Sequence, residues 1–175
     1  MRQHRIILVE TGPGLPVAEA HRHWHERHAD VYLPTPLLAG YVQNRPLAEE
    51  WERLGSRSIC SETWFADHDA EKASFASEYY RETVMPDERR FLARESAWVG
   101  RFLDEPPWPD PLPRYRVLAF GVELAGGATA TVDRPPLTVA SLWLDDRDEA
   151  LALARAVDGH AFAAEPAVLR PPPAA

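Results

Sequence analysis

The alternation of apolar and polar residues in the first part of the chain predicts four strands and two helical regions. The strands are short apolar or β-branched runs, which lie at about 5–10, 38–47, 58–65 and 95–103. The first helical region follows the first run and covers about 16–32. The second follows the third run and has two pieces, at about 69–80 and 86–93. This βαββαβ order predicts an α+β fold, a ferredoxin-like sandwich with two helices on one face of an antiparallel sheet.

The remaining residues are expected to form a C-terminal extension of about two strands and one helix. A proline-rich connector at 104–113 precedes them, and the elements are expected at 115–124, 137–144 and 146–157. Trp64-Phe65-Ala66-Asp67 and Trp143-Leu144-Asp145-Asp146 each lead from a strand into a helix with an acidic cap, which suggests an abbreviated second half-domain.

These patterns define the expected domain organisation. The domains are a folded unit over 1–103, an extension or half-domain over 104–170 and a disordered tail over 171–175. Polar residues at 49–57 and the segment 125–136 are expected to be loops.

Composition and charge exclude several partners for this chain. The 175 residues carry a formal net charge of −8 and contain no run of basic residues, so we expect no nucleic-acid partner. No apolar stretch reaches the length of a membrane-spanning helix, and none resembles a signal peptide, so we expect a cytoplasmic protein with no membrane partner. The excess of arginine over lysine indicates a GC-rich bacterial genome.

Four of the seven histidines lie within eight positions, at His21, His23, His25 and His28. On a helical wheel His28 lies nearest to the apolar stripe, one turn beyond Trp24, whereas His23 points about 140° away and is expected to face solvent. A partly desolvated imidazole at the rim of the core can act as general base or acid. The alternative is that His28 is a core histidine bonded to a backbone carbonyl.

The same spacing is compatible with a metal ion, but His25-Glu26-Arg27-His28 lacks the His-Glu-x-x-His pairing of a zinc helix. We therefore expect no metal, and a solvated helix edge for His21 and His25.

Two strands carry polar side chains suited to substrate binding. Glu62 shares a face with Cys60 and Trp64, and is a candidate proton carrier unless it makes a structural hydrogen bond to a neighbouring strand or an arginine. Tyr41 and Asn44 lie on opposite faces of the preceding strand and can orient a polar group of a substrate, or serve only in packing.

Several short motifs together resemble the EthD family of the dimeric α/β-barrel superfamily. They are Trp24 followed by His28-Ala29, the strand Gly40-Tyr41-Val42-Gln43-Asn44, the strand Glu62-Thr63-Trp64-Phe65, and Asp87-Glu88 with Phe91. The resemblance covers about residues 5–103. It implies a ferredoxin-like subunit that forms a homodimer sheet to sheet, a pocket between helices and sheet, and His28 at the catalytic position.

From these observations we expect a cofactor-independent enzyme that acts on an aromatic or polyketide-like small molecule by cyclisation, dehydration, decarboxylation or isomerisation. The catalytic residues would be His28 and Glu62. The substrate-binding residues would be Trp24, His25, Tyr32, Tyr41, Asn44, Trp64, Asp87 and Phe91. The alternatives are a cofactor-free oxygenase on the same fold and a non-catalytic protein that binds an aromatic metabolite.

Overall fold

The computed structural model describes residues 2–104, 108–133 and 136–173. Its centre is one eight-stranded sheet in the order β4-β1-β3-β2-β8-β5-β7-β6, in which every pair of neighbours is antiparallel. The strands are β1 (Gln3–Thr11), β2 (Leu38–Pro46), β3 (Arg57–Phe65), β4 (Leu92–Arg101), β5 (Tyr115–Phe120), β6 (Ala128–Asp133), β7 (Pro136–Leu144) and β8 (His160–Arg170).

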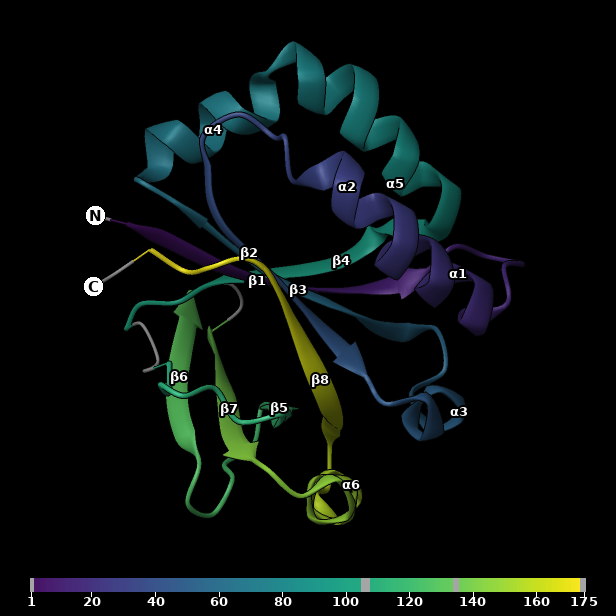
Figure 1. The fold of residues 1–175 in the computed structure, drawn as a ribbon, viewed down its shortest axis with the longest axis vertical. Coiled ribbons are helices and arrows are strands. Elements are labelled where there is room, and N and C mark those ends of the chain that lie inside the picture. Colours follow the sequence, from purple (N-terminus) through teal and green to yellow (C-terminus); the bar gives the residue numbers. More distant parts are fainter. Residues whose placement is uncertain (1, 105–107, 134–135, 174–175) are drawn as a thin grey trace.

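The helices form a thick layer over the first four strands and a single helix over the last four (Figure 1). The first layer contains α1 (Val17–His23) with α2 (Ala29–Tyr32), and α4 (His68–Ala76) with α5 (Met85–Phe91). Two π-helical turns, Trp24–His28 and Tyr80–Val84, interrupt these helices. A short helix α3 (Trp51–Leu54) follows β2, and α6 (Arg147–Ala156) covers the second half.

The two halves share one order of strands, namely last, first, third and second. Asp67 and Asp146 each cap the helix that follows the third strand of their half, accepting hydrogen bonds from the backbone N–H of Ala70 and Glu149. The second half therefore repeats the strand order and the helix cap of the first, but has one helix instead of a thick layer.

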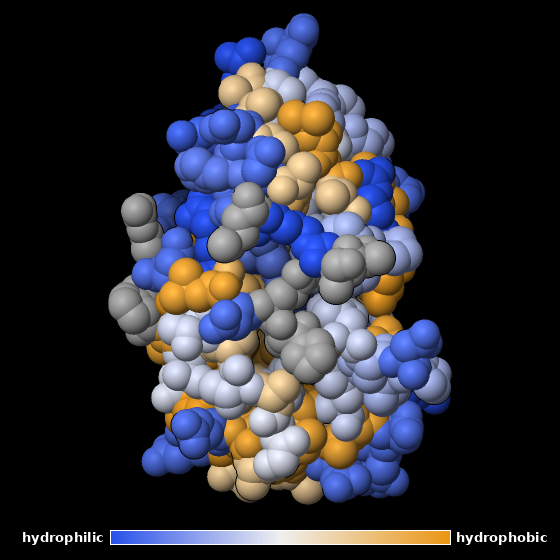
Figure 2. Space-filling view, turned by 90° about the vertical axis from the view of Figure 1, so that its left-hand side faces the viewer, coloured by the Kyte–Doolittle hydropathy of each residue, from blue (hydrophilic) through white to orange (hydrophobic). Residues whose placement is uncertain are grey.

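The sheet curls until its two edge strands, β4 and β6, meet. Phe102 pairs with Val132, and the backbone N–H of Leu103 donates to the carbonyl of Thr131 at 3.0 Å. Gly100 permits this approach, because a Cβ there would lie 2.7 Å from the Cβ of Val132. The chain ends also come together, since Arg2 Nη1 donates to the carbonyl of Pro173 at 2.7 Å (Figure 1). Hydrophilic residues cross the middle of that face of the molecule (Figure 2).

The expected strands and helices are present, but three expectations for the connections were wrong. Residues 49–57 contain α3, and 125–136 contain β6. The extension has four strands instead of two, because 160–170 form β8 between β2 and β5. β8 is rich in alanine, which has weak β propensity, and contains Pro166, which lies beyond the stretch paired with β5. Of the expected disordered tail, 171–173 have no regular structure and 174–175 lie outside the described residues.

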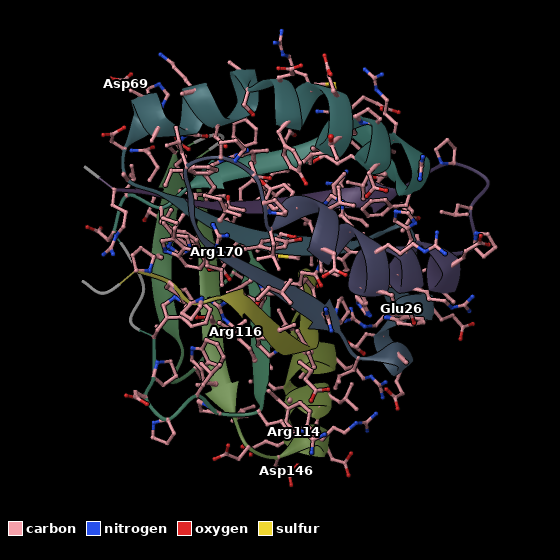
Figure 3. The ribbon with its side chains drawn as sticks, turned by 45° about the horizontal axis from the view of Figure 1, so that its top comes forward. Glu26, Asp69, Arg114, Arg116, Asp146 and Arg170 are labelled. Carbon is pink, nitrogen blue, oxygen red and sulfur yellow. The ribbon has the colours of Figure 1, made fainter. Side chains whose placement is uncertain are left out.

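A buried ion pair joins the two halves inside the curled sheet. Arg116 of β5 contacts Glu62 of β3 through Nη1, and the two side chains are 1% and 0% exposed. Asn44 Nδ2 donates to Glu62 Oε1 at 2.8 Å, and His4 Nε2 lies 2.8 Å from Glu62 Oε2. The Arg116 guanidinium also lies over the ring of Trp143 at 4.8 Å. Figure 3 shows Arg116 among the strands beneath the helices.

Replacing Arg116 alone should destabilise the fold more than replacing both partners. Arg116→Met leaves the Glu62 charge buried without its partner, which costs about 3–5 kcal/mol, whereas Glu62→Leu with Arg116→Met leaves no such charge. Urea unfolding measures both. Arg114→Met is the matched control: its pair with Glu165 is exposed, so its loss should cost at most about 1 kcal/mol. Additive effects of the two core substitutions would contradict this interpretation.

The same pair predicts a loss of stability in acid. Burial opposes ionisation of Glu62, but Arg116 and His4 outweigh it and lower the pKa of Glu62 to about 2. A carboxyl with a depressed pKa in the folded state stabilises the fold above its unfolded pKa of about 4.3, and loses this contribution as the pH falls towards 2. Urea midpoints between pH 5 and pH 2.5 should therefore fall more steeply for the wild type than for the double variant. Equal slopes would refute the assignment.

Candidate functional site

A cavity of about 150 Å³ lies between the helical layer and the first four strands. Six aromatic side chains dominate its wall, and they are Trp24, Tyr32, Tyr41, Phe75, Tyr80 and Phe91. Six polar side chains also line it, and they are Arg5, His28, Ser61, Thr63, Glu88 and Arg94. A concave, largely apolar space with a few convergent polar groups is typical of a small-molecule site.

The π turn at Trp24–His28 places two histidines on one carboxylate. His28 Nδ1 lies 2.8 Å from Asp87 Oδ2, and His23 Nε2 lies 2.9 Å from Asp87 Oδ1. The expectation that His23 faces solvent was wrong, because the helical wheel assumes 3.6 residues per turn. In a π turn the backbone repeat is i to i+5, which is the spacing of His23 and His28.

Asp87 determines which nitrogen of His28 carries the proton. Burial alone would raise the pKa of Asp87, but the hydrogen bonds from His28 and His23 outweigh it and hold that pKa below its usual value. An ionised carboxylate can only accept, so both histidines must donate to it. In neutral His28 the proton therefore lies on Nδ1, and Nε2 keeps its lone pair, as a general base requires.

Glu88, the neighbour of Asp87, is a second ionisable group in the cavity wall. Its carboxylate accepts from Tyr80 Oη at 3.1 Å and pairs with Arg94 Nε at 2.9 Å. Burial raises the pKa of Glu88 despite Arg94. Burial also raises the pKa of Tyr80, and raises that of Tyr41 to about 12, so both phenols keep their protons at neutral pH.

The structure brings together six of the residues expected at the site from the sequence. Trp24, His28, Tyr32, Tyr41 and Phe91 line the cavity, and Asp87 supports His28 from behind. His28 lies 5.0 Å from the ring of Phe91 and 5.4 Å from that of Tyr32, so aromatic rings fix the imidazole on two sides.

The other four expected residues lie elsewhere. Glu62, Asn44 and Trp64 point to the opposite face of the sheet, where Glu62 pairs with Arg116, because side chains alternate along a strand. Tyr41 and Glu62 therefore cannot share one pocket. His25 does not line the cavity, and burial lowers its pKa to about 3, with Arg45 adding to the effect.

The solvated edge expected for His21 was also wrong. His21 is fully buried, stacks on the ring of Trp51 at 4.6 Å and lies 2.9 Å from the hydroxyl of Ser58. The short helix that brings Trp51 to this position was expected to be a loop.

Arg5, Thr63 and Glu88 line the cavity, yet the sequence analysis assigned none of them to the site and named Thr63 and Glu88 only as members of motifs. A single arginine or threonine on a strand has no motif. The signal available was alternation, because Arg5, Ile7 and Val9 occupy the face of β1 opposite to Ile6 and Leu8.

Among the residues that the structure describes, no group of three or more histidine, cysteine, aspartate or glutamate side chains is placed to hold a metal ion. No helix in this part of the chain is long and apolar enough to cross a membrane.

The family-model comparison matches residues 12–95 to the EthD domain. This segment is an EthD domain. The resemblance seen in the sequence motifs is thereby confirmed, and it places the segment in the dimeric α/β-barrel superfamily. The EthD domain contributes the helical layer and most of the cavity wall, whereas β5–β8 lie outside the matched residues. A comparison with curated proteins gave no significant match.

Two solved structures match this chain over most of its length. A protein from Fusobacterium nucleatum subsp. nucleatum ATCC 25586 has a TM-score of 0.50 and 7% identity over 96% of this chain and 92% of that chain. A protein from Lactobacillus acidophilus NCFM has a TM-score of 0.49 and 10% identity over 96% of this chain and 94% of that chain. Both are called "putative monooxygenase". At this identity the likeness to the Fusobacterium protein shows the fold alone.

Asp87→Asn should disturb both histidines. An asparagine amide can accept through Oδ1 but not through its NH₂ group, so one ring N–H loses its acceptor. We expect the ¹⁵N resonances of His28 to show a population protonated on Nε2, and the free energy of unfolding to fall by about 1–3 kcal/mol. Asp30→Asn, at an exposed position on the same helix, is the control and should leave both unchanged. A His28 tautomer unaffected by Asp87→Asn would contradict the assignment.

Proposed function

We propose that this protein is an enzyme that moves a proton on a small, flat, largely hydrophobic molecule held in the cavity of the EthD domain. The observation that carries the proposal is the His28–Asp87 pair at the wall of an aromatic cavity. The volume of about 150 Å³ resembles that of buried cavities that accept benzene, so a single aromatic ring fits better than a multi-ring polyketide.

His28 would act as general base and then as general acid. Its Nε2 would take a proton from a substrate carbon next to a carbonyl, and Asp87 would stabilise the imidazolium that forms. Return of that proton to another carbon gives isomerisation. Its transfer to a β-hydroxyl group, which leaves as water when its C–O bond breaks, gives dehydration, and attack of the enolate on a second carbonyl gives cyclisation. The hydroxyl of Tyr41 is protonated at neutral pH and can donate to the enolate oxygen.

Removal of the His28 imidazole should abolish most of the activity. With small aryl ketones as probes, we expect His28→Ala to lower the enzyme-catalysed exchange of the α-proton in D₂O by about 10²- to 10⁴-fold, because that is the usual contribution of a positioned base. The exchange is followed by NMR. His25→Ala is the matched control, since His25 lies on the same helix outside the cavity wall. Exchange at the wild-type rate in a folded His28→Ala protein would exclude His28 as the base.

A cofactor-free oxygenase is the second candidate. The name of the Fusobacterium protein, which shares only the fold, motivates it, and a carbanion formed by His28 could react with dioxygen directly. Oxygen uptake during turnover would favour this candidate, and turnover without oxygen uptake would favour proton transfer alone. A binding protein without catalysis predicts ligand binding that survives His28→Ala, with no reaction in either protein.

We also propose that β1–β4 with their helices are a ferredoxin-like unit, and that β5–β8 are an abbreviated repeat of it. The common strand order and the matching Asp67 and Asp146 caps support this interpretation. A homodimer was expected because the sheet would otherwise leave an apolar face exposed. That reason no longer applies, since β5–β8 cover that face, but the homodimer itself stays a prediction, as does a cytoplasmic location.

A further inference from the structure

Besides the His28–Asp87 pair, the cavity has a second polar group, which comes from two strands of the sheet. Arg5 of β1 and Thr63 of β3 are direct partners in the antiparallel register, so their side chains lie next to each other on the cavity face. Arg5 is 8% exposed and Thr63 is fully buried. Arg5 Nη1 and Thr63 Oγ1 have no hydrogen-bond partner among the residues that the structure describes. A buried donor without a partner is costly, which suggests that a ligand supplies the acceptor.

Arg5 shares its carboxylate partner with a second arginine. Arg5 Nε lies 3.0 Å from Glu71 Oε1, but Arg101 holds the same carboxylate through Nη2 at 2.9 Å and Nε at 3.1 Å. Arg101 also has a second carboxylate, since its Nη1 lies 3.8 Å from Asp133 Oδ2, whereas Arg5 shares Glu71 with it. Among the ionisable groups of the wall other than histidine and tyrosine, Arg94 and Glu88 pair with each other, whereas the partner of Arg5, Glu71, lies outside the wall.

The geometry of Arg5 limits what can meet it. Its guanidinium lies over the ring of Phe75 at 4.6 Å, so the aromatic ring covers one face of the group. The N–H groups of Nη1, in the guanidinium plane, remain, and they suit a carboxylate oxygen better than a neutral carbonyl. The Thr63 hydroxyl can donate a further hydrogen bond to the same oxygen.

We propose that Arg5 and Thr63 form an anion-binding subsite, and that the ligand of this cavity is a small aromatic ring bearing a carboxylate. The aromatic wall receives the ring and the strand floor receives the charged oxygen. Where the ligand is also a substrate, this inference rests on the proposed function, because His28 would then act on the part of the molecule farther from the carboxylate. Binding itself does not require catalysis.

Titration calorimetry with two probes of nearly the same shape tests the subsite. Benzoate carries the charge and benzamide does not. We expect the wild type to bind benzoate at least about 10-fold more tightly than benzamide, and Arg5→Gln to weaken benzoate binding by about 10- to 100-fold, the range for loss of a hydrogen bond to a charged group. Thr63→Val, which keeps the side-chain shape, should weaken benzoate binding by about 3- to 10-fold.

Arg101→Gln is the matched control, because Arg101 also pairs with Glu71 but does not line the cavity. It should leave the affinity for benzoate within about twofold of the wild type. Equal binding of benzoate and benzamide by the wild type, or no binding of benzoate up to its solubility limit, would overturn the proposal. An equal loss of benzoate affinity in Arg101→Gln and Arg5→Gln would also overturn it. If Arg5→Gln does not fold, a folded Thr63→Val protein with unchanged affinity for benzoate would overturn it instead.

His28→Ala separates this proposal from the proposed function. If it binds benzoate as the wild type does, the subsite stands whether or not α-proton exchange is lost. If the wild type binds benzoate more tightly than benzamide as expected, but His28→Ala still catalyses α-proton exchange, the proposed function fails and the subsite remains.

Discussion

The ion pair between Glu62 and Arg116 is the contact on which the arrangement of the two halves depends. It lies where the first four strands face the last four, and both partners are removed from water. Either charge, buried without its partner, would strongly destabilise the fold. The halves therefore cannot separate without breaking this ion pair. Asn44 and the rings of Trp108 and Trp143 complete the surroundings of Arg116. The side chains on the inner face of the sheet therefore hold the two halves together.

The outer face of the same strands lines the ligand cavity. On β3, Glu62 points inward to Arg116, while Ser61 and Thr63 point outward into the cavity. On β1, His4 points inward to Glu62, and Arg5 points outward. The alternation of a strand thus separates a structural charge cluster from the ligand cavity by the thickness of one sheet.

The sequence predicted most of the EthD domain because its patterns are local. The stripe of Trp24 and its neighbours predicted a helix over 16–32, and α1, the π turn and α2 together span Val17–Tyr32. The placement of His28 near the core followed from the same stripe. His23 was misplaced because a π turn has no signature in the apolar pattern. Glu62 was assigned to the site because the sequence shows which residues share a face, but not which face meets the helices.

The parts that could not be predicted depend on contacts between distant segments. β8 has little strand propensity of its own, and its place between β2 and β5 comes from pairing on both sides. Arg5 and Thr63 lie 58 positions apart and have meaning only as partners across β1 and β3. A lone arginine in a strand gives no reason to expect a buried guanidinium whose Nη1 lacks a hydrogen bond next to an aromatic cavity.

The way that α6 packs has a consequence for stoichiometry. It rests on β5, β7 and β8 through small side chains such as Ala150 and Ala154, whereas the helices of the first half rest on large aromatic rings that leave a cavity. An assembly of two identical subunits would carry two equivalent cavities, and every substitution would appear in both. Here one half holds the ligand space and the other closes the sheet, so their sequences are free to diverge. A titration of this cavity should reach saturation at one ligand per closed sheet, whereas a closed sheet of two identical subunits would take two.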